Sequence, residues 1–112
     1  MIKRISMLTR KPGMSREEFN DYWLKVHGPF VEKLPGVIRY IQNHIVDDAH
    51  RHDLPSGGQA VDGFVEFWFE DVRSMDAAFA TPQAKEAFAD GAKFIESVTT
   101  FVIDEHVVID NG

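Results

Sequence analysis

His27 is the side chain in this sequence best suited to proton transfer at neutral pH. It follows Trp23 by four residues, in a segment whose apolar residues recur at helical spacing, and Gly28-Pro29 comes directly after it. An imidazole titrates near neutral pH without a large shift, so His27 could act as a general acid or base. The alternative is a structural role, in which a charged imidazole complements the dipole at the carboxyl end of a helix.

A second set of polar side chains falls on one side of a β-prone segment, residues 37–46. These are Tyr40, Gln42 and His44, which share a side because side chains alternate along a strand. An unpaired polar group in a closed core costs about 1–3 kcal/mol. We therefore expect these three side chains to face a water-filled cavity or a solvated surface. Tyr40 is then either a pocket residue or a phenol at the edge of the core.

The aromatic segment at residues 64–69 offers walls for such a cavity. Phe64, Glu66 and Trp68 share one side of this segment. An apolar pocket with a few convergent polar groups is the usual form of a small-molecule site, so we expect these residues to contact a substrate. Burial beside the rings would raise the pKa of Glu66; alternatively, Glu66 faces water or joins an ion pair.

The polar segment at residues 47–62 carries two further histidines, His50 and His52. Together with Asp53 they resemble a metal-binding cluster, but Arg51 between them disfavours a cation, and no metal site is predicted. A solvated loop accounts for these charges. Alternatively, His52 closes over the cavity as part of a lid, because binding residues often lie on loops.

The elements that must position these residues follow the order β-α-β-β-α-β. Ser15 and Glu18 form a capping-box pattern that begins the first helix, and Pro29 is expected to end it, because proline disfavours helical geometry in the preceding residue. The expected strands are residues 2–9, 37–46, 64–69 and 98–109, and two later helices are expected to begin at Asp71 or Ser74 and at Pro82. This order predicts a ferredoxin-like α+β fold, with a four-stranded antiparallel sheet and helices on one face.

The other face of that sheet is left without helices and needs cover. We expect it to carry Tyr40, Gln42 and His44, and an aromatic-rich uncovered face in a globular protein implies a partner. A second copy of the chain is the simplest partner. The expectation is therefore a homodimer, a dimeric α+β barrel whose closed cavity holds the site.

Length and composition bound the remaining possibilities. The 112 residues fit one domain, residues 1–112, and the net charge of −6 argues against a nucleic-acid partner. No apolar run approaches the ~20 residues that span a bilayer, and no secretory signal pattern is seen, so a cytoplasmic protein without a membrane partner is expected. Cysteine is absent. Gly-rich phosphate loops, GxSxG and HExxH are missing, and no cofactor is predicted.

Several of these motifs together resemble the EthD family of small dimeric α+β barrel proteins. The resemblance covers nearly the whole chain and rests on residues 11–19, Tyr22-Trp23, His27-Gly28-Pro29, Pro35-Gly36 and Tyr40. Relatives include proteins linked to ether degradation, polyketide dehydratases or cyclases, and methylmuconolactone isomerases.

The isomerase relatives imply a cofactor-free site with a histidine at the first helix end and a tyrosine on the second strand, which match His27 and Tyr40. A loop histidine is also implied, for which His52 is the better match and His50 competes. Phe67 stands where an isomerase relative has cysteine, which argues against the specific lactone isomerisation.

The leading hypothesis is a cofactor-independent isomerase or lyase of the kind used in catabolism of aromatic compounds, acting on a small lactone, phenolic or polyketide-like substrate. His27, Tyr40 and His52 are its expected catalytic residues. The expected substrate-binding residues are Tyr22, Trp23, Gln42, His44, Phe64, Glu66 and Trp68. The competing hypotheses are a protein that binds small aromatic metabolites without converting them, and a monooxygenase.

Overall fold

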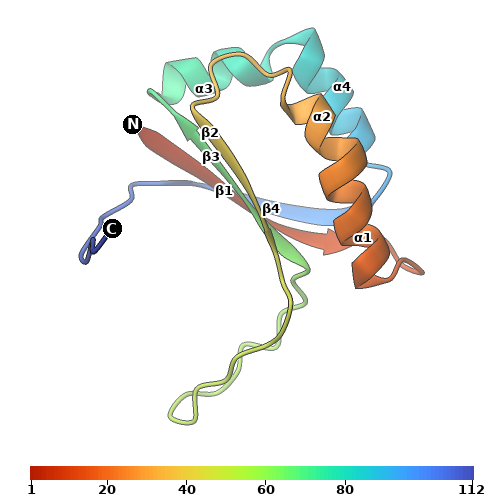
Figure 1. Ribbon diagram of the computed structural model, residues 1–112, viewed down its shortest axis with the longest axis vertical. Coiled ribbons are helices and arrows are strands. Elements are labelled where there is room, and N and C mark those ends of the chain that lie inside the picture. The colour runs from red at the N-terminus through yellow and green to blue at the C-terminus, as the bar shows by residue number, and fades with distance from the viewer.

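The computed structural model describes residues 1–112 as one antiparallel sheet with helices packed on one of its faces (Figure 1). The elements in chain order are β1 (Ile2–Arg10), α1 (Arg16–Tyr22), η1 (Trp23–His27), α2 (Gly28–Val31), β2 (Arg39–His44), β3 (Gly63–Phe69), α3 (Val72–Phe79), α4 (Pro82–Gly91) and β4 (Ile95–Ile103). The strand order is β2-β3-β1-β4, and all three pairings are antiparallel. The predicted ferredoxin-like α+β fold is confirmed.

Local signals set the helix starts. Ser15 and Glu18 form both hydrogen bonds of the expected capping box at the start of α1. Asp71 caps α3 by accepting from the Ser74 N–H, and Thr81 caps α4 just before Pro82. These three starts lie where the sequence predicts them.

The first helix does not end at Gly28-Pro29, which corrects the prediction. It continues through a wider turn, η1, into α2, and the Gly28 N–H donates to the Trp23 carbonyl five residues earlier. Pro29 sits in the first turn of α2, where its missing N–H is not needed. A widened turn also removes the regular hydrogen-bond ladder with which a proline ring clashes. His27 therefore lies inside a continuous helical segment.

The last strand is also shifted from its expected position. It spans Ile95–Ile103 instead of residues 98–109, because it pairs with β1 from Arg10 back to Lys3, and β1 begins at Ile2. Only Ile2 remains on β1 beyond the last pair, so residues after Ile103 have almost no strand to pair with. The second strand is likewise shorter than expected, Arg39–His44.

The sheet register overturns the expected facing of β2. Tyr40 pairs with Phe67 and Gln42 pairs with Val65, and directly paired residues share a face of the sheet. Phe67 and Val65 belong to the buried core under the helices. Tyr40, Gln42 and His44 consequently face the helices, whereas we expected them on the uncovered face.

The core between sheet and helices is dominated by aromatic rings. Trp23, Phe19, Phe69 and Phe94 are the largest fully buried side chains. Phe19 contacts both Trp23 and Phe94, with ring centroids 5.5 and 5.3 Å apart. Trp23 also stacks on His44 at 4.8 Å, which joins η1 to β2.

None of the helices is long and apolar enough to cross a membrane.

Gly63 gives a direct test of how tightly Trp23 is held. A Cβ added there would lie 2.5 and 2.8 Å from Trp23 Cζ3 and Cη2, and 3.2 Å from the Asn43 carbonyl oxygen. Since the indole is fully buried and cannot move aside freely, Gly63→Ala is expected to lower the free energy of unfolding by about 1–3 kcal/mol in urea titrations. Gly57→Ala, where no atom lies within 4 Å, is the control and is expected to change it by less than about 0.5 kcal/mol. Equal stability of the two variants would contradict the packing described.

Candidate functional site

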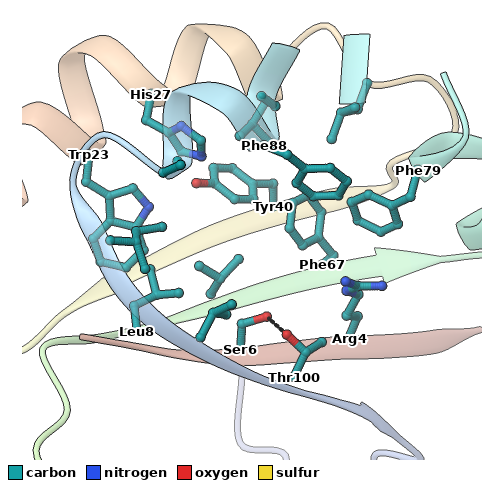
Figure 2. Close-up of a pocket in the computed structure, with 18 of the residues that line it drawn as sticks. Arg4, Ser6, Leu8, Trp23, His27, Tyr40, Phe67, Phe79, Phe88 and Thr100 are labelled. Carbon is teal, nitrogen blue, oxygen red and sulfur yellow. Dashed lines mark hydrogen bonds between the residues drawn. The ribbon is translucent and has the colours of Figure 1, made fainter. Parts of the chain in front are cut away.

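A cavity of about 380 Å³ lies between the sheet and the helices (Figure 2). Its lining comes from all four strands and from η1, α2, α3 and α4, and 13 of its 20 lining residues are hydrophobic. Volume and composition are those of a small-molecule site. The cavity belongs to a single chain and lies on the helix side of the sheet, not on the uncovered face where we expected it.

His27 lines this cavity and is held by a buried carboxylate. Its Nδ1 lies 2.9 Å from Asp90 Oδ2, and the Tyr22 hydroxyl donates to Asp90 Oδ1 at 2.7 Å. Asp90 is only 3% exposed, so its charge is balanced by these donors and not by water. Three residues from α1, η1 and α4 thus form one hydrogen-bonded chain.

The Asp90 contact fixes which nitrogen of His27 carries the proton in the neutral ring. A carboxylate only accepts hydrogen bonds, so Nδ1 must donate, and Nε2 keeps its lone pair. Nε2 has no hydrogen-bond partner within the chain, and the side chain is 12% exposed. The imidazole therefore presents a free basic nitrogen, the form needed for a general base.

Tyr22 helps to hold the His27–Asp90 pair in place. The hydrogen bond to Asp90, together with burial and the carboxylate charge, raises the pKa of Tyr22 to about 12. The phenol stays protonated at neutral pH and keeps donating to Asp90. Both the Tyr22 and the His27 rings rest on Phe94, with centroids 5.0 Å away in each case.

Tyr40 lines the same end of the cavity as His27, as Figure 2 shows. Gln42 Nε2 donates to the Tyr40 oxygen at 2.9 Å, so the phenol's own proton remains available to a ligand. Burial raises the pKa of Tyr40, although the hydrogen bond from Gln42 offsets part of that rise. Tyr40 is therefore a neutral donor placed near a basic nitrogen.

Gln42 and His44 stand behind Tyr40 and do not line the main cavity. Gln42 Nε2 also donates to the Trp23 carbonyl at 2.9 Å, and its Oε1 lies 2.9 Å from His44 Nε2. Burial lowers the pKa of His44, so the ring stacked on Trp23 is neutral at neutral pH. These two residues, expected to contact substrate, instead fix the orientation of Tyr40 and of the widened turn.

The structure places Phe64, Glu66 and Trp68 on the opposite face of the sheet, away from the cavity. Glu66 pairs with Lys3, whose ammonium lies 4.6 Å from the centroid of the Trp68 ring. Burial alone would raise the pKa of Glu66, but the hydrogen bonds from Lys3 and Asn43 and the nearby cationic charges hold it below its ordinary value. Glu66 is thus ionised in an ion pair, the second of the two alternatives we considered.

His50 and His52 are not brought to the cavity either. The loop between β2 and β3 extends away from the sheet and helices in Figure 1, and both histidines are exposed. Arg51 and Asp53 pair with each other there. No group of three or more His, Cys, Asp or Glu side chains is arranged to hold a metal ion.

Asp90 is the main site residue that no motif singles out. The signal available was its position: Ala84, Ala87 and Asp90 are spaced by three residues on the buried side of α4. A carboxylate in such a stripe is costly unless paired, which points to a nearby donor. Arg4, Ser6 and Thr100, which also line the cavity, lie on strands and carried no motif at all.

The comparisons with known proteins agree with this fold. The EthD domain model matches residues 11–97. An EthD family protein from Bacillus halodurans is 23% identical with a TM-score of 0.74, covering 95% of this chain and 99% of that chain. A DABB family protein with a ferredoxin-like fold from Mesorhizobium loti is 13% identical with a TM-score of 0.72, covering 95% and 97%.

A dimeric ferredoxin-like protein of unknown function from Thermobifida fusca is 13% identical with a TM-score of 0.69, covering 91% of this chain and 88% of that chain. Identities this low show a shared fold and nothing finer. Among proteins with curated functions, none matches this chain.

Proposed function

The chain belongs to the EthD family, and from that premise we propose that it is a cofactor-independent isomerase or lyase that moves a proton on a small oxygenated substrate. The observation that carries the proposal is the His27–Asp90 hydrogen bond at the wall of an apolar cavity that also holds Tyr40. A base with a fixed tautomer and a neutral donor near it are the two groups that such a reaction needs.

In the proposed reaction, His27 Nε2 removes a proton from a carbon next to a substrate carbonyl. The electron pair of the broken C–H bond moves toward the carbonyl oxygen, where the Tyr40 O–H stabilises the developing negative charge. In an isomerisation, His27 returns the proton to a different carbon. In a lyase reaction, the electron pair expels a leaving group from the adjacent carbon, and His27 can supply the proton that the leaving group takes.

Asp90 has two functions in this scheme. It orients the imidazole, and it stabilises the positive charge that His27 acquires when it takes the proton. Tyr22 restrains Asp90 through the second carboxylate oxygen, and so acts as a positioning residue rather than touching substrate. Trp23 contributes apolar wall, which excludes water from the reacting atoms.

The experiment that tests this function measures proton exchange. The protein is incubated in D₂O with a panel of lactones, hydroxy ketones and phenolic ketones, and each compound is followed by NMR. We expect protein-dependent deuterium incorporation or conversion for at least one class. Saturable binding without exchange or conversion across the panel would overturn the proposal and favour the alternative, a protein that binds such compounds without converting them.

We further propose that the chain acts as a homodimer assembled through the helix-free face. That face carries Ile5, Ile41 and Phe64, and Phe101 on β4 is 51% exposed there. Ile5 pairs directly with Phe101, and the Lys3–Glu66 ion pair lies beside them. Exposed apolar side chains on a sheet face without helices favour a second copy of the chain, and the similar protein from Thermobifida fusca is described as dimeric. Light scattering coupled to size exclusion is expected to give twice the mass of one chain; a stable monomer would contradict it.

A further inference from the structure

Arg4 places a guanidinium in the wall of the cavity without a carboxylate partner. The residue is half-buried, the central carbon of its guanidinium lies 4.3 Å from the centroid of the Phe79 ring, and its side chain forms no hydrogen bond or ion pair with the rest of the chain. Lys3, the neighbouring cation on β1, faces the other side of the sheet and has two carboxylate partners, Glu66 and Glu105. The guanidinium donors of Arg4 are therefore not used by the rest of the chain and are available to a ligand in the cavity.

The nearest carboxylates of the chain do not satisfy Arg4. Burial lowers the pKa of Arg4, and Asp76 on α3 acts on it in the opposite direction from beyond ion-pair distance. Glu96 also lines the cavity, but it lies six residues along β4 from Val102, the residue that pairs with Arg4. That spacing is about 20 Å along an extended strand, too far for contact.

A pair of hydroxyl groups adjoins Arg4 on the floor of the cavity. Ser6 and Thr100 are hydrogen-bonded oxygen to oxygen at 2.8 Å, and Ser6 is only 8% exposed (Figure 2). One proton is used in that bond, and the other hydroxyl proton has no acceptor in the chain. Guanidinium and hydroxyl donors thus lie on the same side of the sheet, two residues apart on β1.

The strand register fixes where these donors lie relative to Tyr40. Tyr40 pairs with Phe67, and Phe67 pairs with Arg4, so the three lie in one row across the sheet. Two strand spacings separate Tyr40 from Arg4, which is about 10 Å between backbones. The Phe67 ring lies between Tyr40 and Arg4, as Figure 2 shows, and provides an apolar surface against which a ring of the ligand can pack.

We propose that the substrate carries a carboxylate, which Arg4 and the free hydroxyl of the Ser6–Thr100 pair bind, while its reacting carbonyl or phenol faces His27 and Tyr40. The assignment of the substrate's reacting group to His27 and Tyr40 rests on the proposed function, whereas the carboxylate site does not. A guanidinium binds a carboxylate through two parallel hydrogen bonds, which neutral esters and amides cannot accept as strongly. The cavity is thereby selective for small aromatic or cyclic acids.

The test compares acids with their methyl esters. Benzoate, 4-hydroxybenzoate and cinnamate, each with its methyl ester, are titrated into the protein, and dissociation constants are obtained from NMR shifts. At least one acid is expected to bind about tenfold or more tightly than its ester, the effect of one hydrogen-bonded charge pair. In Arg4→Gln this ratio is expected to fall close to one, whereas Arg73→Gln, an exposed change of the same charge on α3, keeps the wild-type ratio.

Two further variants separate this proposal from folding and from catalysis. The double variant Ser6→Ala, Thr100→Val, which removes both hydroxyl groups of the pair, is expected to lower the acid-to-ester ratio several-fold even if Arg4→Gln fails to fold. His27→Asn is expected to lose turnover but to keep the ratio, so failure of the proton-transfer proposal leaves this test intact. Equal binding of acids and esters, an acid preference that survives Arg4→Gln, or no saturable binding of any acid at millimolar concentration would overturn the carboxylate site.

Discussion

Replacing His27 with asparagine is expected to lower kcat/KM for the proton-transfer reaction by about 10²–10⁴-fold. The substitution removes the free Nε2, the basic nitrogen on the cavity wall, while the shorter amide leaves the surrounding packing largely in place. Because the proposed substrate contacts are mainly the apolar wall and Arg4, the loss is expected in kcat more than in KM. The measurement is steady-state kinetics on whichever substrate the deuterium screen identifies.

The control for this result is a histidine that the structure places outside the cavity. His106→Asn changes an exposed side chain after β4 and is expected to leave kcat/KM unchanged. A His27→Asn variant as active as the His106→Asn variant would remove His27 from the mechanism.

Exchanging Asp90 for asparagine is expected to have the second-largest effect, a loss in kcat of up to about 10⁴-fold, the loss that this exchange causes in the histidine–aspartate pair of serine proteases. An amide can keep accepting from Tyr22 while it presents N–H to His27. The neutral imidazole then carries its proton on Nε2, and the nitrogen facing substrate is no longer a base. Kinetics give the size of the loss, and ¹⁵N chemical shifts of the imidazole report the tautomer.

A structural role alone predicts something different for Asp90→Asn. It predicts lower thermal stability with an unchanged tautomer and an activity that recovers on cooling. Asp110→Asn, in the exposed segment after β4, controls for the change of net charge. If Asp90→Asn kept the wild-type ¹⁵N pattern and rate, the assigned tautomer would be wrong.

Elements that depend on neighbouring residues could be predicted from the sequence. Ser15 with Glu18, and Thr81 with Pro82, act within one helical turn, and both helix starts lie where expected. The fold class followed from the order of such elements. The EthD resemblance is confirmed by the match of the EthD domain model to residues 11–97.

The face of the sheet on which the site lies depends on which residues of β2 and β3 pair. That pairing could not be predicted from the sequence. Neither candidate set, Tyr40 to His44 or Phe64 to Trp68, alternates strictly between polar and apolar residues, so the pattern does not decide which face each side chain takes. The structure pairs Tyr40 with Phe67, which puts the two sets on opposite faces; a shift by one residue would have put them together. Asp90 lies 63 residues from His27, and only the packing of α4 on η1 brings them within hydrogen-bond distance.

The widened turn makes the site dependent on the number of residues in the first helical segment as well as on their types. The hydrogen bond from the Gly28 N–H to the Trp23 carbonyl closes a turn that contains one residue more than a regular α-helical turn. Each residue turns an α-helix by about 100°, so a chain one residue shorter here would rotate His27 relative to Trp23 by that angle. Related chains that keep every site residue but have lost this extra residue would hold the imidazole away from the cavity. In comparing members of the family, a one-residue gap in this turn is therefore more informative about the proposed activity than a substitution on the solvent side of the same helix.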